Sequence, residues 1–293
     1  MAQRVAFLYP GQGTLPREVV PAPANLETLY GIAANAGLPL REWIAAGNMD
    51  RLNRTDAAQP AIFLDSVVRT ALLQASGDTP DVVAGHSLGE YPALVAAGVL
   101  TAEDALRLVL RRGALMSGIP GGMMAVVKLD LERVRSLCEE ITPRVHVANH
   151  NGPTQVVVSG SAAGLDVLAK VVKSYGGQAL PLQVSGPFHS PFMRPAEDAL
   201  APEIARTPFL VPRVSIVSSV SGRAESDPVR LKELLTTQTT ACVRWLDVLD
   251  SLVAMGTTHA VEVGPGNVLT NLGHRATDRI RFLTFKEAVD GSL

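Results

Sequence analysis

Short apolar runs alternate with longer stretches of helical periodicity along most of the chain. The runs are typical of buried strands, and the stretches between them are typical of helices. This alternation predicts an α/β protein whose mainly parallel sheet is covered by helices. The strand-like runs occupy residues 4–9, 82–85, 213–218, 259–263 and 281–285.

The pattern changes between residues 124 and 184, where the predicted order β-α-β-β-α-β is that of a ferredoxin-like unit. The flexible segments "SGIPGGM" and "SGPFHSP" precede and follow it, as is typical of junctions between structural units. We predict a ferredoxin-like small subdomain at 124–187, inserted into a large α/β subdomain made of 1–123 and 188–293. The predicted elements are strands at 124–129, 144–149, 154–160 and 179–184 and helices at 131–140 and 163–177.

Composition narrows the class of protein. The chain has 293 residues, 47% of them hydrophobic, and a net charge of −2, so it can bury a large core but lacks the basic excess that favours nucleic-acid or anionic-membrane partners. No apolar run is long enough for a signal peptide or a membrane span, so we expect a cytoplasmic protein. Cys138 and Cys242 lack CxxC or Cys/His spacing, which argues against a disulfide framework and a zinc site.

The segment "GHSLG" at 85–89 joins the strand-like run 82–85 to a helix-like run at 88–99. It fits the G-x-S-x-G nucleophile elbow of α/β-hydrolase-like folds, in which a strained turn exposes the serine. Ser87 is therefore a candidate nucleophile, and the amide of Leu88 would face a developing anion at the start of the helix. A glycine-rich turn with an incidental serine is the alternative, and the five-residue pattern leaves both open.

A serine nucleophile needs a base, and His189 in "SGPFHSP" is the best placed of the six histidines. It lies at the predicted return from the small to the large subdomain, where a cleft would form. His86 is adjacent to Ser87, but consecutive side chains around a tight turn point apart. A loop histidine hydrogen-bonded to the backbone is the commoner use of such a residue, so the residues alone do not decide.

A helix is predicted to begin after Thr101, because Thr101 and Asp104 form an N-cap with an acidic first turn. On its wheel Arg112 faces inward, whereas Arg111 faces solvent. A buried guanidinium needs an anionic partner. The pattern slightly favours an internal Asp or Glu over a substrate carboxylate. The inward stripe contains Ala105, Leu108, Val109, Arg112 and Met116.

Two further glycine-rich turns follow predicted strands, "PGQG" at 10–13 and "EVGPGNVL" at 262–269. The carboxyl ends of strands are where open α/β sheets bind ligands. "PGQG" does not continue to G-x-G-x-x-G, so a dinucleotide site is not indicated.

Taken together and in this order, the motifs resemble those of malonyl-CoA:acyl carrier protein transacylases and the acyltransferase domains of polyketide synthases. The elbow alone is shared with many hydrolases, whereas the combination is not. The matching stretches are "PGQG" at 10–13, "TDAAQPAI" at 55–62, "GHSLGEY" at 85–91, "RRGALM" at 111–116, "ANHNGPTQVVVSG" at 148–160, "GPFHSPFM" at 186–193, "QTTACVRW" at 238–245 and "EVGPGNVLTNL" at 262–272.

The resemblance implies a Ser-His dyad in place of a triad. Ser87 would be acylated, and His189 would be its base, oriented by the backbone carbonyl of Gln238. The backbone amides of Gln12 and Leu88 would form the oxyanion hole.

The resemblance also implies a substrate pocket. Arg112 would pair with the free malonyl carboxylate, which reverses the preference from the helical pattern. Asn151 would shape the site from the small subdomain, and Met116 would bind the substrate beside Arg112. Leu88 and Phe188 match the motif variants associated with malonyl rather than methylmalonyl groups.

The implied reaction is ping-pong transfer from malonyl-CoA through Ser87 to the phosphopantetheine thiol of an acyl carrier protein. We expect a monomer that uses no metal or redox cofactor, with malonyl-CoA as substrate. The alternatives are a serine esterase or thioesterase and a non-catalytic acyl-binding subunit of a synthase. Fatty-acid synthesis, polyketide synthesis and malonate decarboxylation are all compatible with the sequence.

The chain departs from the family pattern after Gly13. Thr14-Leu15-Pro16 stands where Ser-Gln is common, and Pro21 and Pro23 interrupt helix formation. The resemblance therefore does not extend to the wall of the active-site entrance.

Overall fold

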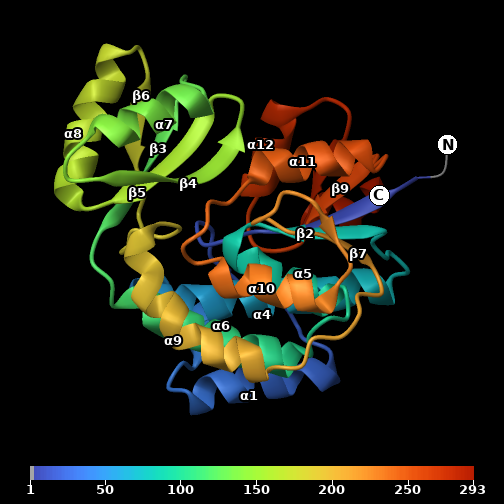
Figure 1. The fold of residues 1–293 in the computed structure, drawn as a ribbon. Coiled ribbons are helices and arrows are strands. Elements are labelled where there is room, and N and C mark those ends of the chain that lie inside the picture. Colours follow the sequence, from blue (N-terminus) through green and yellow to red (C-terminus); the bar gives the residue numbers. More distant parts are fainter. Residues whose placement is uncertain (1–2) are drawn as a thin grey trace.

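The computed structural model describes residues 3–293 and contains two sheets that lie side by side (Figure 1). The larger sheet has six strands in the order β10-β9-β1-β2-β7-β8. All neighbouring pairs are parallel except β7 and β8, so the predicted mainly parallel sheet is confirmed. Its strands are β1 (Val5–Tyr9), β2 (Val82–Gly85), β7 (Ser215–Val217), β8 (Ala224–Glu225), β9 (His259–Glu262) and β10 (Arg281–Thr284).

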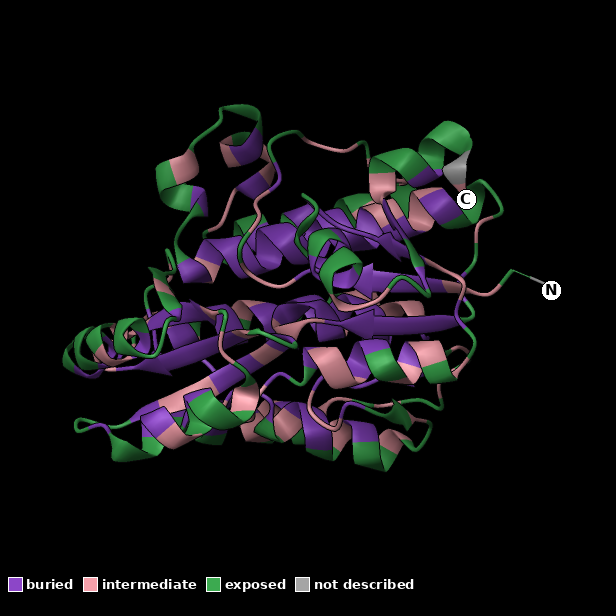
Figure 2. Ribbon diagram, turned by 90° about the horizontal axis from the view of Figure 1, so that it is seen from above, coloured by how far each residue is buried: buried purple, intermediate pink, exposed green. Residues whose placement is uncertain are grey.

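Helices cover both faces of this sheet, because alternate residues of each strand point to opposite sides. Phe7 and Tyr9 of β1 pack into the cluster formed with α4 (Thr55–Ala75), α5 (Glu90–Ala96) and α6 (Ala102–Ser117). Ala6 and Leu8 pack against α11 (Trp245–Ala254) and α12 (Val268–Ala276) on the opposite face. Figure 2 shows the result, with buried residues in the interior and exposed residues on the outer sides of the helices.

The second sheet is antiparallel, with strand order β4-β5-β3-β6. Two helices, α7 and α8, pack on one of its faces. The chain order β3-α7-β4-β5-α8-β6 is the one predicted. Strand β3 begins before the predicted boundary at 124, and the subdomain limits stay a prediction. The elements are β3 (Gly122–Val127), α7 (Leu131–Glu140), β4 (Val145–Gly152), β5 (Gln155–Gly160), α8 (Ala162–Ser174) and β6 (Gln178–Pro181).

The other face of the antiparallel sheet contacts the larger part of the molecule. Met123 of β3 and Val157 of β5 pack in one apolar cluster with Met116 and Phe188. An isolated parallel bridge also joins Asn149 of β4 to Val243. The two parts of the chain are therefore held together next to the segment that contains Gln238.

The remaining helices surround the larger sheet, and residues 10–23 form no helix, as the prolines predict. The predicted helix at 88–99 is shorter: it begins as a 3-10 turn, Ser87–Gly89, and α5 ends at Ala96 before Gly98, whose φ of +75° favours glycine. No helix within 3–293 is long and apolar enough to cross a membrane. The other helices are the 3-10 helices Ala24–Leu26 and Pro191–Met193, α1 (Glu27–Asn35), α2 (Leu40–Ala45), α3 (Met49–Leu52), α9 (Arg194–Arg206), α10 (Pro228–Thr237), α13 (Phe285–Glu287) and the π-helix Ala288–Ser292.

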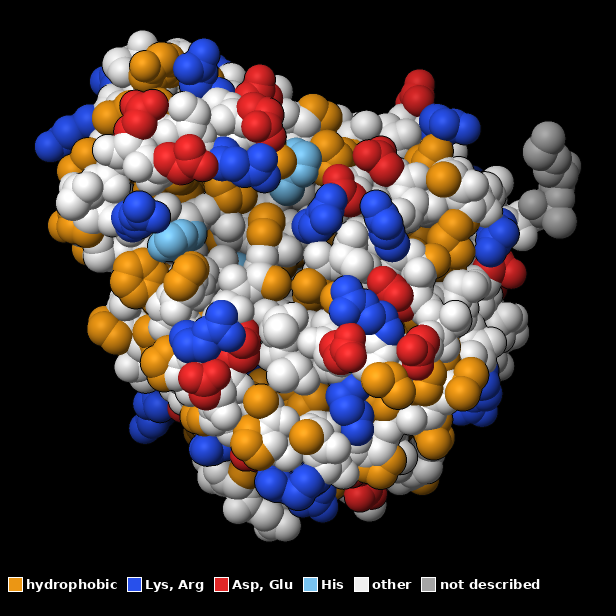
Figure 3. Space-filling model, viewed as in Figure 1, with side chains coloured by type: hydrophobic (Ala, Val, Ile, Leu, Met, Phe, Trp, Pro, Cys, Tyr) orange, Lys and Arg blue, Asp and Glu red, His pale blue; other side chains and the backbone are white. Residues whose placement is uncertain are grey.

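Charged side chains are interspersed on the face seen in Figure 3, where basic and acidic residues lie next to each other. Several form ion pairs one helical turn apart, such as Arg230 with Glu233 at 3.0 Å and Arg244 with Asp247 at 2.5 Å. Such exposed pairs contribute little to stability.

Candidate active site

The turn between β2 and α5 has the geometry of a nucleophile elbow. Ser87 has a φ of +53°, a strained conformation that side chains rarely adopt outside functional sites. A Cβ at Gly85 would lie 2.0 Å from the backbone of Gly89, and a Cβ at Gly89 would lie 2.0 Å from the carbonyl oxygen of Tyr9. Glycine is therefore required at both positions, because any side chain there would clash with the backbone.

Ser87 and His189 are in hydrogen-bond contact, with Oγ 2.7 Å from Nε2. The Nδ1 atom of His189 lies 3.0 Å from the carbonyl oxygens of both Gln238 and Ala241. Because carbonyl oxygens only accept, Nδ1 must carry the proton, and Nε2 is left to accept the proton of Ser87. The sequence did not indicate the second carbonyl, from Ala241.

The charge state of His189 suits a base. The imidazole is 3% exposed, and burial, with smaller effects from Arg112 and His86, lowers its pKa to about 3. It is therefore neutral at neutral pH. No carboxylate within residues 3–293 forms an ion pair with His189, so two backbone carbonyls orient the ring where a triad would use an acid.

Arg112 of α6 points into the same site and is 1% exposed. Its Nη1 donates to Oε1 of Gln59 at 2.6 Å, and its Nη2 donates to Oε1 of Gln238 and to Oγ of Ser87, each at 3.1 Å. Within the described residues no carboxylate lies within 4.0 Å of this guanidinium. The internal ion pair that the helical pattern slightly favours is therefore wrong: the partners of Nη1 and Nη2 are neutral groups.

The two predicted oxyanion-hole residues lie on adjacent segments. Leu88 is the second residue of the 3-10 turn Ser87–Gly89, and Gln12 follows β1. The segments touch because the amide of His86 donates to the carbonyl of Tyr9 at 2.9 Å. The Gln12 side chain donates to Thr55 Oγ1 at 3.2 Å. The oxyanion role of both amides stays a prediction.

Asn151 contacts the elbow through His86, the residue that precedes Ser87. Its Oδ1 lies 2.9 Å from Nε2 of His86, whose ring packs on Trp245 at 5.4 Å between centroids. His86 is thereby turned away from Ser87, as predicted. Phe188 and Met116 share one buried apolar cluster, and Met116 Sδ accepts from Gln59 at 3.6 Å. Substrate contact by Asn151, Phe188 and Met116 stays a prediction.

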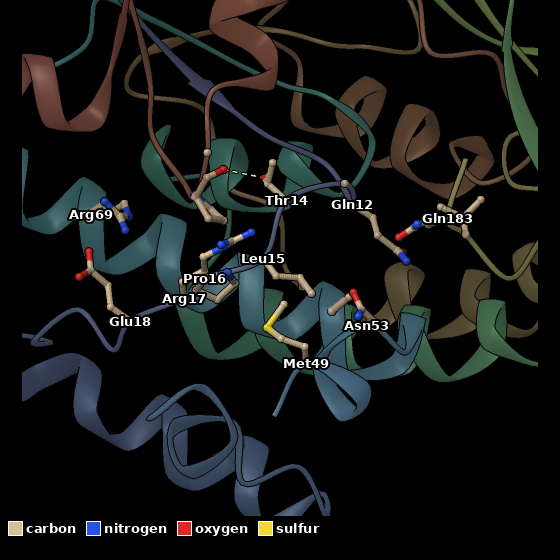
Figure 4. Close-up of a pocket in the computed structure, with 15 residues that line it drawn as sticks. Gln12, Thr14, Leu15, Pro16, Arg17, Glu18, Met49, Asn53, Arg69 and Gln183 are labelled. Atoms are coloured by element: carbon tan, nitrogen blue, oxygen red, sulfur yellow. Dashed lines mark hydrogen bonds between the residues drawn. The ribbon is translucent and has the colours of Figure 1, made fainter. Parts of the chain in front are cut away.

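A cavity of about 680 Å³ adjoins the site at Gln12. Its wall contains the unusual segment 13–18, which is fixed where Thr14 Oγ1 donates to the carbonyl of Pro265 at 2.6 Å. Figure 4 shows Gln12 and Gln183 at one end of this cavity and Glu18 and Arg69 at the other. The segment that departs from the family pattern therefore forms part of the wall of a cavity that reaches Gln12, a predicted oxyanion-hole residue.

Two site residues were not found by sequence reasoning. Gln59 and Glu90 lie within the matched stretches "TDAAQPAI" and "GHSLGEY", but nothing in the local pattern gives them a role. The structure places the Gln59 side chain on Arg112 and that of Glu90 on Gln238. Within residues 3–293 there is no cluster of three or more His, Cys, Asp or Glu side chains suited to a metal ion.

The comparisons with known proteins decide the family, because the acyl transferase domain matches residues 26–289. The chain belongs to the acyl transferase family. The malonyl CoA-acyl carrier protein transacylase of Salmonella typhimurium is 38% identical to this acyl transferase over 94% of the chain and 93% of that protein. The acyl-carrier-protein S-malonyltransferase of Burkholderia pseudomallei superimposes with a TM-score of 0.91 at 35% identity, over 98% of this chain and 100% of that chain.

A third similarity is to a protein solved with a carrier. That structure is described as a type II polyketide synthase acyl-carrier protein in complex with its malonyl-transacylase. It matches this acyl transferase with a TM-score of 0.89 at 31% identity, over 98% of this chain and 99% of that chain.

Proposed function

We propose that this acyl transferase moves a malonyl group from malonyl-CoA to the phosphopantetheine thiol of an acyl carrier protein through a malonyl ester of Ser87. One observation carries the proposal. The buried guanidinium of Arg112, which has no carboxylate partner among the residues the structure describes, lies 3.1 Å from the nucleophilic oxygen. A dicarboxylic acyl group would supply the missing anion. The names of the Salmonella and Burkholderia relatives and of the carrier complex support the same substrates.

In the first half-reaction His189 Nε2 removes the proton of Ser87 as Oγ attacks the thioester carbon. The negative charge that develops on the thioester oxygen would be held by the amides of Gln12 and Leu88. The tetrahedral intermediate then collapses, the C–S bond breaks, and His189 returns the proton to the departing CoA sulfur. A general base of this kind contributes roughly 10²–10⁴-fold to the rate.

The second half-reaction repeats these steps with a different nucleophile. His189 accepts the proton of the carrier thiol, and the sulfur attacks the carbonyl carbon of the malonyl ester. The tetrahedral intermediate collapses, the bond between that carbon and Ser87 Oγ breaks, and His189 returns the proton to Oγ. Both half-reactions need only a base and an oxyanion hole, so we propose that no metal or redox cofactor takes part.

Arg112 would select the acyl group in both half-reactions. The guanidinium can hold a carboxylate with two parallel hydrogen bonds. The esterase alternative gives no role to a buried cation beside the nucleophile, and a non-catalytic subunit gives no role to the 2.7 Å contact between Ser87 and His189.

We also infer that the antiparallel sheet and its two helices form a ferredoxin-like small subdomain, and that the larger part is α/β-hydrolase-like. The strand order β4-β5-β3-β6 and the chain order β-α-β-β-α-β support the first. The elbow between β2 and α5 of the parallel sheet supports the second.

The proposed function is tested by intact-mass analysis after incubation with malonyl-CoA. We expect one malonyl adduct on the parent protein, no adduct on Ser87→Ala, and loss of the parent's adduct when an acyl carrier protein with its phosphopantetheine thiol is added. Release of free malonate without a carrier, at the rate expected of transfer, would instead identify a thioesterase. Absence of any adduct on the parent would contradict the proposal.

A further inference from the structure

Glu90, the first residue of α5, has a buried carboxylate that the reaction does not use directly. It is 2% exposed and accepts three hydrogen bonds, from Ser218 Oγ at 2.7 Å, Ser219 Oγ at 2.7 Å and Gln238 Nε2 at 2.8 Å. No Lys, Arg or His nitrogen in the described part of the chain lies within 4.0 Å of it. The site therefore contains two buried ionisable groups of opposite charge, Glu90 and Arg112, that do not touch.

The side-chain amide of Gln238 lies between these two groups. Arginine can only donate, so the amide oxygen must face Arg112 Nη2, at 3.1 Å. The amide nitrogen then faces Glu90 Oε2 and the carbonyl oxygen of Ser87, at 2.8 and 2.9 Å. This direction suits both charges, because the negative end of the amide dipole meets the cation and the positive end meets the carboxylate.

A separated pair of this kind differs from a direct ion pair because it leaves donors of the guanidinium free for a substrate. A carboxylate in contact with Arg112 would occupy the donors that a substrate carboxylate requires. With Gln238 between them, the negative charge still reduces the cost of burying the guanidinium, since electrostatic interactions act over longer distances in a protein interior than in water. Nε of Arg112 is buried without a protein partner within residues 3–293.

We propose that Glu90 is a positioning residue for Arg112: its carboxylate is the counter-charge of the guanidinium, held one glutamine side chain away so that the donors remain available to the acyl carboxylate. The same negative charge weakens the attraction between Arg112 and the acyl carboxylate, so Glu90 stabilises the buried guanidinium at some loss of malonyl selectivity. This inference rests on the proposed function for the identity of that carboxylate. The placement of Gln238 between the two buried groups comes from the structure alone. Burial raises the pKa of Glu90, and its three donors and Arg112 oppose that rise.

The first test is a thermal-unfolding cycle with Glu90→Gln, Arg112→Met and the double variant, at about pH 8, on the alkaline side of neutrality because burial raises the pKa of Glu90. Glutamine keeps the shape of Glu90 and can still accept from Gln238. We expect Glu90→Gln to melt below the parent, because Arg112 loses its counter-charge. We expect the double variant to melt above Glu90→Gln, by at least about 2 °C, because the uncompensated cation is then gone.

The melting temperature of the double variant relative to that of Glu90→Gln decides whether the two charges are coupled. Two independent packing defects would add, so the double variant would melt below both single variants. That result would overturn the proposal. If Glu90→Gln alone does not fold, a folded double variant still supports the coupling, and an unfolded one overturns it.

The second test measures the ratio of kcat/KM for malonyl-CoA to that for acetyl-CoA. Without the charge of Glu90, the guanidinium has no competing anion, so we expect Glu90→Gln to raise the ratio by roughly 3- to 30-fold, the size of couplings within one hydrogen-bond network. In the Arg112→Met background the same change should leave the ratio unaltered. An unchanged or lowered ratio in the parent background would refute the selectivity role.

Glu262→Gln is the matched control. Glu262 is equally buried, at 1% exposure, and accepts from the amide and hydroxyl of Thr270 at 2.8 and 2.9 Å. We expect it to lower the melting temperature without changing the acyl ratio and without rescue by Arg112→Met. Failure of the parent to form a malonyl adduct would contradict the proposed function, whereas an additive unfolding cycle on a parent that does form it would contradict only the role of Glu90.

Discussion

Methionine at position 112 would remove the guanidinium and keep most of the apolar stem of the side chain. In the parent, Arg112 donates to Gln59, Gln238 and Ser87 and has no protein carboxylate partner in the described residues. Arg112→Met therefore removes a buried charge without leaving another charge in direct contact unpaired. Its principal effect should fall on the substrate that brings a carboxylate, malonyl-CoA.

The magnitude follows from the hydrogen bonds that such a carboxylate would lose. Two charge-assisted hydrogen bonds at about 1.5–3 kcal/mol each amount to about 3–6 kcal/mol of transition-state stabilisation. This corresponds to a decrease of roughly 10²- to 10⁴-fold in kcat/KM for malonyl-CoA relative to acetyl-CoA. Folding stability should change less than this ratio, because removing a desolvated charge partly offsets the lost donors to two buried glutamine oxygens and the lost counter-charge of Glu90.

The assay compares acyl transfer from malonyl-CoA and acetyl-CoA to one carrier protein, with a melting curve for each variant. Arg111→Met is the matched control, since Arg111 is the neighbouring residue on the same helix but faces solvent and pairs with Glu203 at 2.9 Å. It should leave the ratio unchanged and stability within about 0.5 kcal/mol. A folded Arg112→Met variant with an intact malonyl-to-acetyl ratio would refute carboxylate binding by Arg112.

Three further predictions concern the elbow and its base. Because the pKa of His189 is lowered to about 3, the acylation rate should show no inflection near pH 6.5. The contribution of neutral His189 to folding stability is fully present above the unfolded pKa of about 6.5, and it should be lost as the pH falls from there toward about 3, because acid protonates the unfolded state first. An inflection at that pH in stopped-flow acylation would contradict the assignment. Gly89→Ala should cost at least about 3 kcal/mol, because its Cβ would lie 2.0 Å from the oxygen of Tyr9; Gly31→Ala, with nothing within 4 Å, should not destabilise in the same urea titration. Asn151→Ala removes the acceptor 2.9 Å from the imidazole that precedes the nucleophile and should slow acylation about fivefold, from a lost hydrogen bond of about 1 kcal/mol; an unchanged single-turnover rate would remove it from the site.

Features that depend on neighbouring residues were predictable from the sequence. The helix at Leu131–Glu140 has the predicted limits. Thr101 caps α6, because its hydroxyl accepts from the amide of Asp104 at 3.1 Å. The inward direction of Arg112 followed from helical periodicity alone. Helical periodicity, capping and turn preferences depend on residues a few positions apart, so they can be predicted directly from the sequence.

The contacts of the site depend on packing between distant segments. Ser87 and His189 are 102 positions apart, and their 2.7 Å contact depends on how the return from the antiparallel sheet packs beside the elbow. The pattern favoured an internal carboxylate for Arg112, because helical periodicity shows which way a side chain points but not what stands opposite.

By itself, the sequence predicted the alternation of strands and helices, the helix at Leu131–Glu140, the N-cap of α6 and the inward direction of Arg112, because each depends on forces that act along the chain. Only the tertiary structure decided that Arg112 meets neutral groups, that two carbonyls orient His189, and that the amide of Gln238 separates Arg112 from Glu90. Glu90 and Gln238 are 148 positions apart and lie 2.8 Å from each other. Such hydrogen-bond partners depend on how the layers pack together, since a buried polar group bonds to the donor or acceptor that the neighbouring element places next to it.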